Sequence, residues 1–342
     1  MISKKELRAR ILLIVVCLAV GLYCLYTMDK SYDPLARYPY TTDENRDVLL
    51  KYLDSDDIDY LVNQHITPDK FMDFIELKDF DLKNTLYYKE AKETQDADNE
   101  YIVSFVNRFR KNFSYDSLKQ MLMHYSYIDL TTFYENEAVL YSDLRLIADP
   151  TNPYAVLNQE NTVYKYIPEK ITTFNTIFVQ ICMVEDLTNM LDSYASVMDG
   201  QDHLNLVSGE QILDQYVNAS KEYEGVDHYM FSAGKNEQQL GYTIVLEGHD
   251  EWIDLCRQYV DDEYDYSKVE EELSEESKKR MEWIEENAYR YGFVIRYQQE
   301  QEKKTGHWYQ PFMLRYVGVK TAKLMHDSGK GMEQMSFPDE LE

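Results

Sequence analysis

Side chains that could hold a metal or carry acid–base chemistry are sparse in this sequence. Histidine is the commonest metal ligand in proteins, and five of the seven histidines lie in the second half, at His203, His228, His249, His307 and His326. No two of them stand at a short ligand spacing. The densest candidate is LEGHDEW, where Glu247 and Asp250 flank His249. A metal site is one interpretation of this stretch, and a polar turn after a strand is the other.

Two further patterns point away from chemistry. The stretch DSDDID carries Asp54, Asp56 and Asp57, but it lacks the glycine and the distal glutamate of a calcium loop, so helix capping is predicted instead. A Gly-x-Ser-x-Gly elbow and a Cys–His nucleophile arrangement are both missing from the sequence. Ser208 before Gly209 reads as a turn.

The stretch GHWYQPFMLRYVG, residues 306–318, offers a candidate ligand-binding set of Trp308, Tyr309, Phe312 and Arg315. Aromatic rings supply contact area, and a guanidinium can donate two parallel hydrogen bonds to a carboxylate. The alternative is that the aromatic residues pack in a core and that Arg315 forms a structural ion pair.

Helices and short strands are predicted to position these residues. A helix is expected over 183–198, where Val184, Leu187, Leu191 and Tyr194 fall on one face. A second helix should begin at a Ser274 cap and end at Gly292. Strands are predicted in four stretches, HLNLVSG, GYTIVLEG, FVIRY and FMLRYVG. Because these elements do not alternate strictly, the fold class is predicted to be α+β with a small antiparallel sheet flanked by helices.

The first half is predicted to be helical, after a short polar linker over 29–40. NEYIVSFVNRF has apolar residues at helical spacing, and Ser114 caps the next helix. In TPDKFMDFIEL, Thr67 is the expected N-cap and Pro68 the first helical position. ADPTNPYAVLN, with Pro150 and Pro153, marks a boundary. The expected domains are therefore 1–30, 31–150 and 151–342, and the charged stretch around 261–276 is expected to be a solvated loop and helix start.

The second half, roughly 151–335, resembles the VanY-like D-alanyl-D-alanine carboxypeptidases, which are zinc peptidases of cell-wall metabolism. Three stretches carry the resemblance. YAVLNQENTVYKYIP looks like the start of the family's domain, and WIEENAYRYGFVIRY is similar to its helix–turn–strand segment. TGHWYQPFMLRYVG stands where the family has TGYxYEPWHLRYVG. The resemblance implies a zinc ion held by His and Asp of S-x-H-x-x-G-x-A-x-D and by His of E-x-W-H, with Glu of the second motif as general base.

This sequence departs from the family at each of those positions. Gln310 stands in place of the base and Met313 in place of the last histidine. In NEQQLGYTIV, Gln238 replaces the first histidine and Val245 the aspartate, while Gly241 is retained. An amide cannot accept the proton, and a valine offers no lone pair to zinc. We therefore expect vestigial positions, no metal and no cofactor. The family's substrate-contacting arginine is also missing, from the shortened stretch VSGEQILDQY.

The N-terminus predicts a membrane anchor. Residues 11–28 carry no charge, which is about the minimum length of a membrane-spanning helix, and they follow the basic residues Lys4, Lys5, Arg8 and Arg10. The basic flank predicts a cytoplasmic N-terminus and an exported bulk in a single-pass cell-membrane protein. A cleaved signal peptide is the alternative. In an exported chain, Cys182 and Cys256 could form a disulfide or remain free thiols.

Three functions are compatible with these features. A formal net charge of −27 argues against nucleic-acid binding. The preferred hypothesis is a membrane-anchored extracytoplasmic pseudoenzyme that binds a peptidoglycan stem peptide or an envelope protein without zinc hydrolysis. An active metallo-carboxypeptidase with a substitute metal site is the first alternative. A purely structural envelope scaffold, which docks partners through the N-terminal helices and the acidic insertion, is the second.

Overall fold

The computed structural model describes residues 4–31, 33–141, 143–209, 234–260 and 263–337. The contacts of the chain divide it into two compact units, Met1–Arg110 and Lys111–Glu342, called here the N-terminal unit and the C-terminal unit. Helices between Lys111 and the predicted boundary therefore belong to the C-terminal unit, where Tyr125 Oη donates a hydrogen bond to Ile147 O at 3.0 Å. The domain boundary that the sequence predicts near residue 150 stays a prediction.

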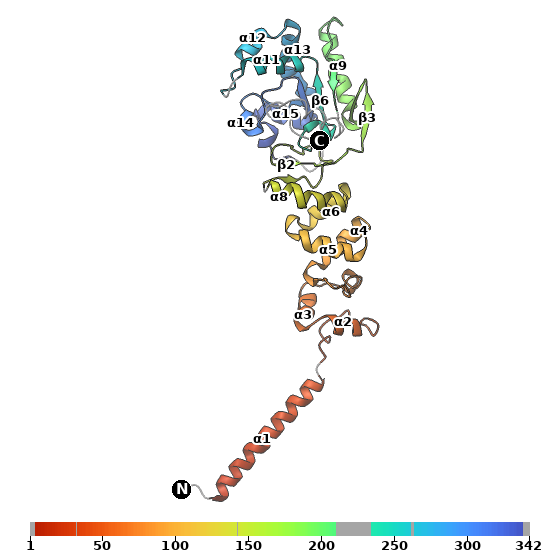
Figure 1. Cartoon of the computed structure of the whole chain (residues 1–342), viewed down its shortest axis with the longest axis vertical. Coiled ribbons are helices and arrows are strands. Elements are labelled where there is room, and N and C mark those ends of the chain that lie inside the picture. Colours follow the sequence, from red (N-terminus) through yellow and green to blue (C-terminus); the bar gives the residue numbers. More distant parts are fainter. Residues whose placement is uncertain (1–3, 32, 142, 210–233, 261–262, 338–342) are drawn as a thin grey trace. The chain divides into compact units, whose positions relative to one another are not determined.

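Helix α1, Lys4–Ser31, is one uninterrupted helix (Figure 1). Its stretch Arg10–Met28 has a mean hydropathy of 2.5, and none of it is buried within the protein. Its 19 residues make it long enough to cross a membrane. A signal sequence near an N-terminus has the same length and composition, so the helix agrees with both interpretations of the sequence.

The N-terminal unit continues with short helices around one core. They are α2 Arg46–Tyr52, α3 Ser55–Asn63, the 3₁₀ turns η1 Pro68–Lys70 and η2 Leu82–Asn84, α4 Thr85–Thr94 and α5 Asn99–Phe109. The capping role of DSDDID is confirmed, since Asp54 accepts a hydrogen bond from Asp57 N and the Asp57 side chain accepts one from Asp54 N. Helix α5 is confirmed too, with Ile102 and Val106 fully buried.

Two expectations for this unit were wrong. Thr67 is the N-cap and Pro68 the first helical position, as predicted. The helix that follows is only the short 3₁₀ turn η1 and then a run of turns, because burying Phe71 and Ile75 in the core outweighs local helix propensity. The stretch 29–40 is not simply a polar linker, since Leu35 and Tyr38 lie in the same core. Tyr38 Oη also donates a 2.7 Å hydrogen bond to Ile66 O.

The C-terminal unit starts with helices and then mixes helices with strands. Its first part contains α6 Tyr115–His124, α7 Tyr127–Thr132, the π-helical turn η4 Phe133–Glu137, α8 Ala138–Leu140, β1 Arg145–Leu146, β2 Asn161–Thr162, β3 Ile171–Phe174, β4 Ile177–Gln180, the turn η5 Ile181–Met183 and α9 Val184–Val197. The second part contains β5 Leu206–Ser208, the turn η7 Glu237–Leu240, β6 Thr243–Leu246, α11 His249–Tyr259, α12 Ser267–Glu272, α13 Glu275–Asn287, the turn η8 Ala288–Tyr291, β7 Phe293–Ile295, α14 Glu302–Thr305, β8 Met313–Tyr316, α15 Val319–Ser328 and the turn η9 Met332–Gln334.

The predicted α+β fold with a small antiparallel sheet is confirmed. Four strands pair in the order β5-β6-β8-β7, with every neighbouring pair antiparallel. The predicted caps of α13 are also correct, because Ser274 accepts from Ser277 N and Gly292 is left-handed, with φ of 82° after η8. Helices α9, α11, α12 and α13 gather at one end of this unit (Figure 1).

The acidic insertion is more ordered than expected. It forms α12, and its apolar residues Tyr266, Val269 and Leu273 are buried. Tyr309 N donates a 2.8 Å hydrogen bond to Tyr266 Oη, so the insertion holds the stretch that precedes β8. Residues 261–262 lie outside the described residues. The high charge of this stretch predicted a solvated loop. The free energy gained by burying three apolar side chains outweighs the tendency of those charges to stay in solvent.

Asp202 joins α9 to α13 and should make stability depend on pH. Arg280 Nη2 donates to Asp202 Oδ1 at 2.5 Å, and Tyr194 Oη donates to Oδ2 at 2.6 Å. Partial burial raises the pKa of the Asp202 carboxyl, but these hydrogen bonds outweigh that effect and lower the pKa to about 2. A lowered folded-state pKa means that the ionised form stabilises the fold above the ordinary pKa of 3.8, and that this stabilisation is lost as pH falls towards 2.

Asp202→Asn should therefore cost about 1–2 kcal/mol of unfolding free energy near about pH 6, after allowance for partial exposure. The difference from the wild type should shrink towards zero near about pH 2. Urea unfolding across this pH range measures it. Asp192→Asn, an exposed change on α9, is the control and should show no such convergence. A pH-independent difference for Asp202→Asn would contradict the prediction.

Candidate functional site

Two of the four positions predicted to be vestigial face each other at the centre of the four-stranded sheet, and the other two lie before its two central strands. Val245 on β6 is the register partner of Met313 on β8, and both pack with Tyr297 in one small hydrophobic cluster. Gln310 precedes β8, and Gln238 lies on η7 just before β6. The residue exposures are 4% for Gln238, 5% for Val245, 0% for Gln310 and 5% for Met313. All four side chains are therefore largely covered by protein atoms.

Local hydrogen bonds position Gln238. Asn236 caps η7 by accepting a 2.9 Å hydrogen bond from Gln238 N, and Gly241 ends the turn with φ of 75°. The Gln238 Nε2 group donates to Ser208 Oγ at 2.7 Å and to Gly209 O at 2.9 Å. The carboxamide therefore ties η7 to the end of β5.

Gln310 is held by the start of α11. Gly248 has φ of 105°, and a Cβ there would lie 2.8 Å from the Phe312 ring, so only glycine lets this turn pack so closely. The turn places His249 Nε2 at 3.1 Å from Gln310 Oε1. Because an amide oxygen accepts only, the imidazole nitrogen must carry the hydrogen in this contact.

The LEGHDEW stretch does not gather its ligands around His249. The Glu247 carboxylate accepts instead from Asn205 Nδ2 at 2.6 Å, and Arg280 Nη1 lies 3.4 Å from it. Asp250 Oδ1 is 3.5 Å from His249 Nδ1. Across the described ranges, no group of three or more His, Cys, Asp or Glu side chains is arranged to hold a metal ion.

Among the remaining histidines of the second half, His307 borders the Val245–Met313 cluster through Tyr297. His307 is buried with its ring stacked on Tyr297, at 4.1 Å between centroids, and His326 stacks on Tyr289 at 3.7 Å. His203 is exposed, and His228 lies outside the described residues. The stretch VSGEQILDQY is described only as far as Gly209.

The side chains at the four vestigial positions do not fit the zinc ion that the family resemblance implies. At the three ligand positions a carboxamide, a hydrocarbon and a thioether replace the imidazole and carboxylate donors that zinc takes, and Gln310 replaces the general base. The Val245–Met313 pair faces a hydrophobic cluster, and that environment suits neither a charged ion nor an ionised ligand.

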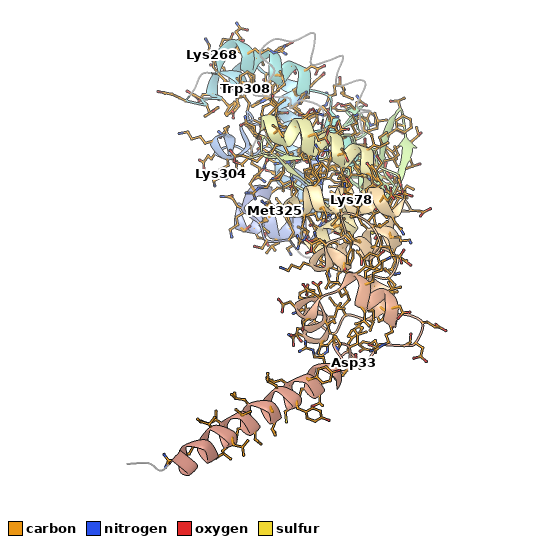
Figure 2. The ribbon with its side chains drawn as sticks, turned by 60° about the horizontal axis from the view of Figure 1, so that its bottom comes forward. Asp33, Lys78, Lys268, Lys304, Trp308 and Met325 are labelled. Carbon is orange, nitrogen blue, oxygen red and sulfur yellow. The ribbon has the colours of Figure 1, made fainter. Side chains whose placement is uncertain are left out.

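The predicted ligand-binding set is split between surface and core. Tyr309, Phe312 and Arg315 are at most 4% exposed, whereas Trp308 is partly exposed (Figure 2). Tyr309 Oη donates to Glu285 Oε1, and Trp252 Nε1 donates to Tyr309 O at 2.7 Å. A direct ligand contact by these residues stays a prediction, and Trp308 is the member of the set with accessible surface.

Arg315 belongs to a buried charge network. Its Nη1 lies 2.6 Å from Glu237 Oε2, and Arg296 Nε lies 2.9 Å from Glu237 Oε1, with all three side chains fully buried. Arg296 also pairs with Glu333 at 2.8 Å. The sequence analysis missed Glu237 and Arg296, because a charged residue in a short turn or strand carries no local sign of burial. The observed contacts of Arg315 are therefore those of a structural ion pair, which was the alternative to ligand binding in the sequence analysis.

The two cysteines outside α1 are separate free thiols. Cys182 is exposed on η5, and Cys256 is buried on α11. Burial raises the pKa of the Cys256 thiol to about 12, so it stays protonated and unreactive near neutral pH.

Comparisons with known proteins find a similarity to a peptidase family in part of this chain. Residues 199–319 match the family model "VanY: D-alanyl-D-alanine carboxypeptidase". The putative carboxypeptidase YodJ of Bacillus subtilis is 46% identical over 52 residues, which is 15% of this chain and 19% of that protein. A D-alanyl-D-alanine carboxypeptidase of Enterococcus faecium is 27% identical over 157 residues, 39% of this chain and 48% of that protein. The matches thus span less than half the length of these curated relatives.

Solved structures are similar to part of this chain as well. The LdcB LD-carboxypeptidase has a TM-score of 0.43 at 24% identity and covers 56% of this chain and 88% of its own. VanYB in complex with D-alanine-D-alanine has a TM-score of 0.39 at 22% identity and covers 53% of this chain and 96% of its own. Residues 199–319 of this chain are therefore similar to the VanY family of D-alanyl-D-alanine carboxypeptidases.

Proposed function

We propose that this protein is a non-hydrolytic VanY-like protein of the cell envelope. Residues 11–28 anchor it in the cell membrane, and the bulk of the chain lies outside the cytoplasm. It binds a cell-wall peptide or an envelope protein and does not cleave it.

The observation that carries the proposal is the chemistry of the four vestigial positions. Gln310 can hydrogen-bond but cannot act as a general base, and Val245 supplies no ligand atom. The hydrocarbon side chain of Val245 and the thioether of Met313 belong to one hydrophobic cluster. The chemistry is changed at four positions together, while Gly306, Pro311, Leu314, Arg315 and Tyr316 remain as in the family's segment. This pattern is expected when a fold is retained and its reaction is lost.

The relatives support a wall peptide as one ligand class. The Enterococcus faecium relative is a D-alanyl-D-alanine carboxypeptidase, and the VanYB structure holds D-alanine-D-alanine. Helix α1 supports the placement at the membrane by its length and composition. Trp308, with its partly exposed ring, is the side chain we expect to contact such a peptide.

Metal content and peptide cleavage test the proposal on the full chain in detergent. After zinc loading and desalting, we expect no stoichiometric zinc by elemental mass spectrometry and no D-alanine release from a peptide that ends in D-alanyl-D-alanine. The Enterococcus faecium relative, treated in the same way, is the positive control. About one zinc ion per chain that is lost in His249→Ala would favour the substitute-metal alternative.

Binding to isolated peptidoglycan sacculi separates the remaining possibilities. Retention of the wild type, with weaker retention of Trp308→Ala, would support a wall-peptide ligand. Failure of both proteins to bind would leave the envelope scaffold as the better description. Pull-down from membranes with and without residues 41–110, which leaves the C-terminal unit whole, then tests that scaffold role.

A further inference from the structure

A pocket separate from the vestigial positions lies beside strand β7. It has a volume of about 380 Å³ and is lined by residues of α13, η8 and β7, by Gln298, Gln299 and Tyr309, and by His326 of α15 (Figure 2 marks α15 by Met325). Its size falls within the range of small-ligand and peptide side-chain pockets. None of Gln238, Val245, Gln310 and Met313 lines it.

Strand β7 leaves one backbone edge turned away from the sheet. In the described sheet it is the last strand and pairs with β8 alone. Arg296 N donates to Met313 O and Val317 N donates to Gly292 O, both at 2.9 Å. Because hydrogen-bonded residues alternate along an antiparallel pair, the N–H and C=O of Ile295 point away from β8. An outward donor and acceptor on an edge strand form a template for another extended chain.

The walls of the pocket combine apolar surface with negative charge. Ile284, Ala288 and Val294 contribute buried hydrocarbon. Glu285 contributes a carboxylate that accepts from Tyr309 Oη, with Glu282 and Glu286 beside it on the same helix. Partial burial raises the pKa of Glu285, and the neighbouring carboxylates raise it further. A cation bound beside Glu285 would favour its ionised form and so offset the effects of burial and of the neighbouring carboxylates.

We infer that β7 and this pocket, together called the β7 groove, bind an extended segment of a partner protein as an added strand. The Ile295 backbone would pair with that segment, the hydrocarbon walls would take an apolar side chain, and Glu285 would pair with a lysine or arginine. Strand addition combines main-chain hydrogen bonds with pockets for alternate side chains in this way. The inference does not depend on the loss of zinc hydrolysis, since the two sites share no vestigial residue.

The probe is a short fluorescein-labelled peptide that alternates valine and threonine around one central lysine. Its binding to the full chain in detergent is followed by fluorescence anisotropy. We expect saturable binding that is weakened by salt. The same peptide with glutamate in place of lysine, or with N-methylated backbone amides, should bind about tenfold more weakly or not at all.

Two variants address the two parts of the β7 groove. Ile295→Pro removes the outward N–H, and the ladder hydrogen bonds made by the residues on either side can persist, as proline is tolerated at a sheet edge. Glu285→Gln removes the charge with little change of shape. Each should weaken binding by about tenfold, whereas Glu160→Gln, an exposed change in the same compact unit, should leave it unchanged.

The outcomes are decisive in both directions. Equal binding of the N-methylated and unmodified peptides, or of Glu285→Gln and wild type, would overturn the inference. Displacement of the probe by a peptide that ends in D-alanyl-D-alanine would reassign the groove to wall peptide. Tryptophan fluorescence melting checks the fold of Ile295→Pro. If that variant is unfolded, Glu285→Gln and the N-methylated peptide still decide the question.

Discussion

Glu237→Gln should lower the unfolding free energy of the C-terminal unit by about 3–5 kcal/mol. Glu237 is the carboxylate shared by the buried guanidiniums of Arg296 and Arg315. Glutamine keeps the shape of the side chain but removes its charge. In the described residues, Arg296 would then keep Glu333 as an acidic partner, and Arg315 would lose the carboxylate with which it pairs. Breaking a buried ion pair on one side is strongly destabilising because the remaining charge stays desolvated.

The same change should loosen the segment that leads into this unit. Leu157 N donates a 3.0 Å hydrogen bond to Glu237 Oε1, and Arg315 Nη2 donates to Pro153 O at 2.7 Å. Residues 153–157 form no strand or helix, and the charge network holds them together with the buried side chains of Tyr154 and Leu157. Protease sensitivity in this segment should therefore rise together with the loss of stability.

Urea unfolding followed by tryptophan fluorescence measures the effect, because all three tryptophans, Trp252, Trp283 and Trp308, lie in the C-terminal unit. Glu333→Gln is the matched control. Its partner is also Arg296, but the Glu333 side chain is 13% exposed, so we expect a loss of only about 1 kcal/mol. Equal losses for the two variants would show that Glu237 has no special role.

Rebuilding the family motif should create a zinc site. We expect the combined variant Gln238→His, Val245→Asp, Gln310→Glu and Met313→His to retain about one zinc ion per chain where the wild type retains none. Residues 245 and 313 are directly opposite across β6 and β8, and cross-strand partners lie about 4.5–5.5 Å apart at Cβ, which suits two ligands of one ion. Elemental mass spectrometry and D-alanine release measure the gain.

The control is the same variant with Val245 kept. It lacks one ligand and should bind zinc at least about 100-fold more weakly, since even the loss of an outer-shell partner lowers metal affinity by about 10–100-fold. Failure of the complete variant to bind zinc, in a protein that melts normally, would contradict the assignment of these four positions. Stoichiometric zinc in the wild type would contradict the proposed function itself.

Several features of this protein were determined by the sequence alone. Helix α5, helix α9 and the capped helix α13 agree with their apolar spacing and caps, because helix formation depends on contacts within a few residues. Three short stretches, with GHWYQPFMLRYVG among them, were enough to indicate the resemblance to the VanY family. The apolar run over 11–28 likewise predicted a helix of membrane-spanning length, which α1 provides.

Other features were decided only by the tertiary structure. The run of turns after Thr67 and the buried side of α12 follow from packing against distant residues. Likewise, His249 reaches Gln310 across 61 residues of sequence, and Glu237 reaches Arg315 across 78. The spacing of apolar residues along the chain does not predict contacts between residues so far apart in the sequence. A charge can be buried only where the folded chain supplies its partner, so the buried ion pair of Arg315 with Glu237 was decided by long-range contacts.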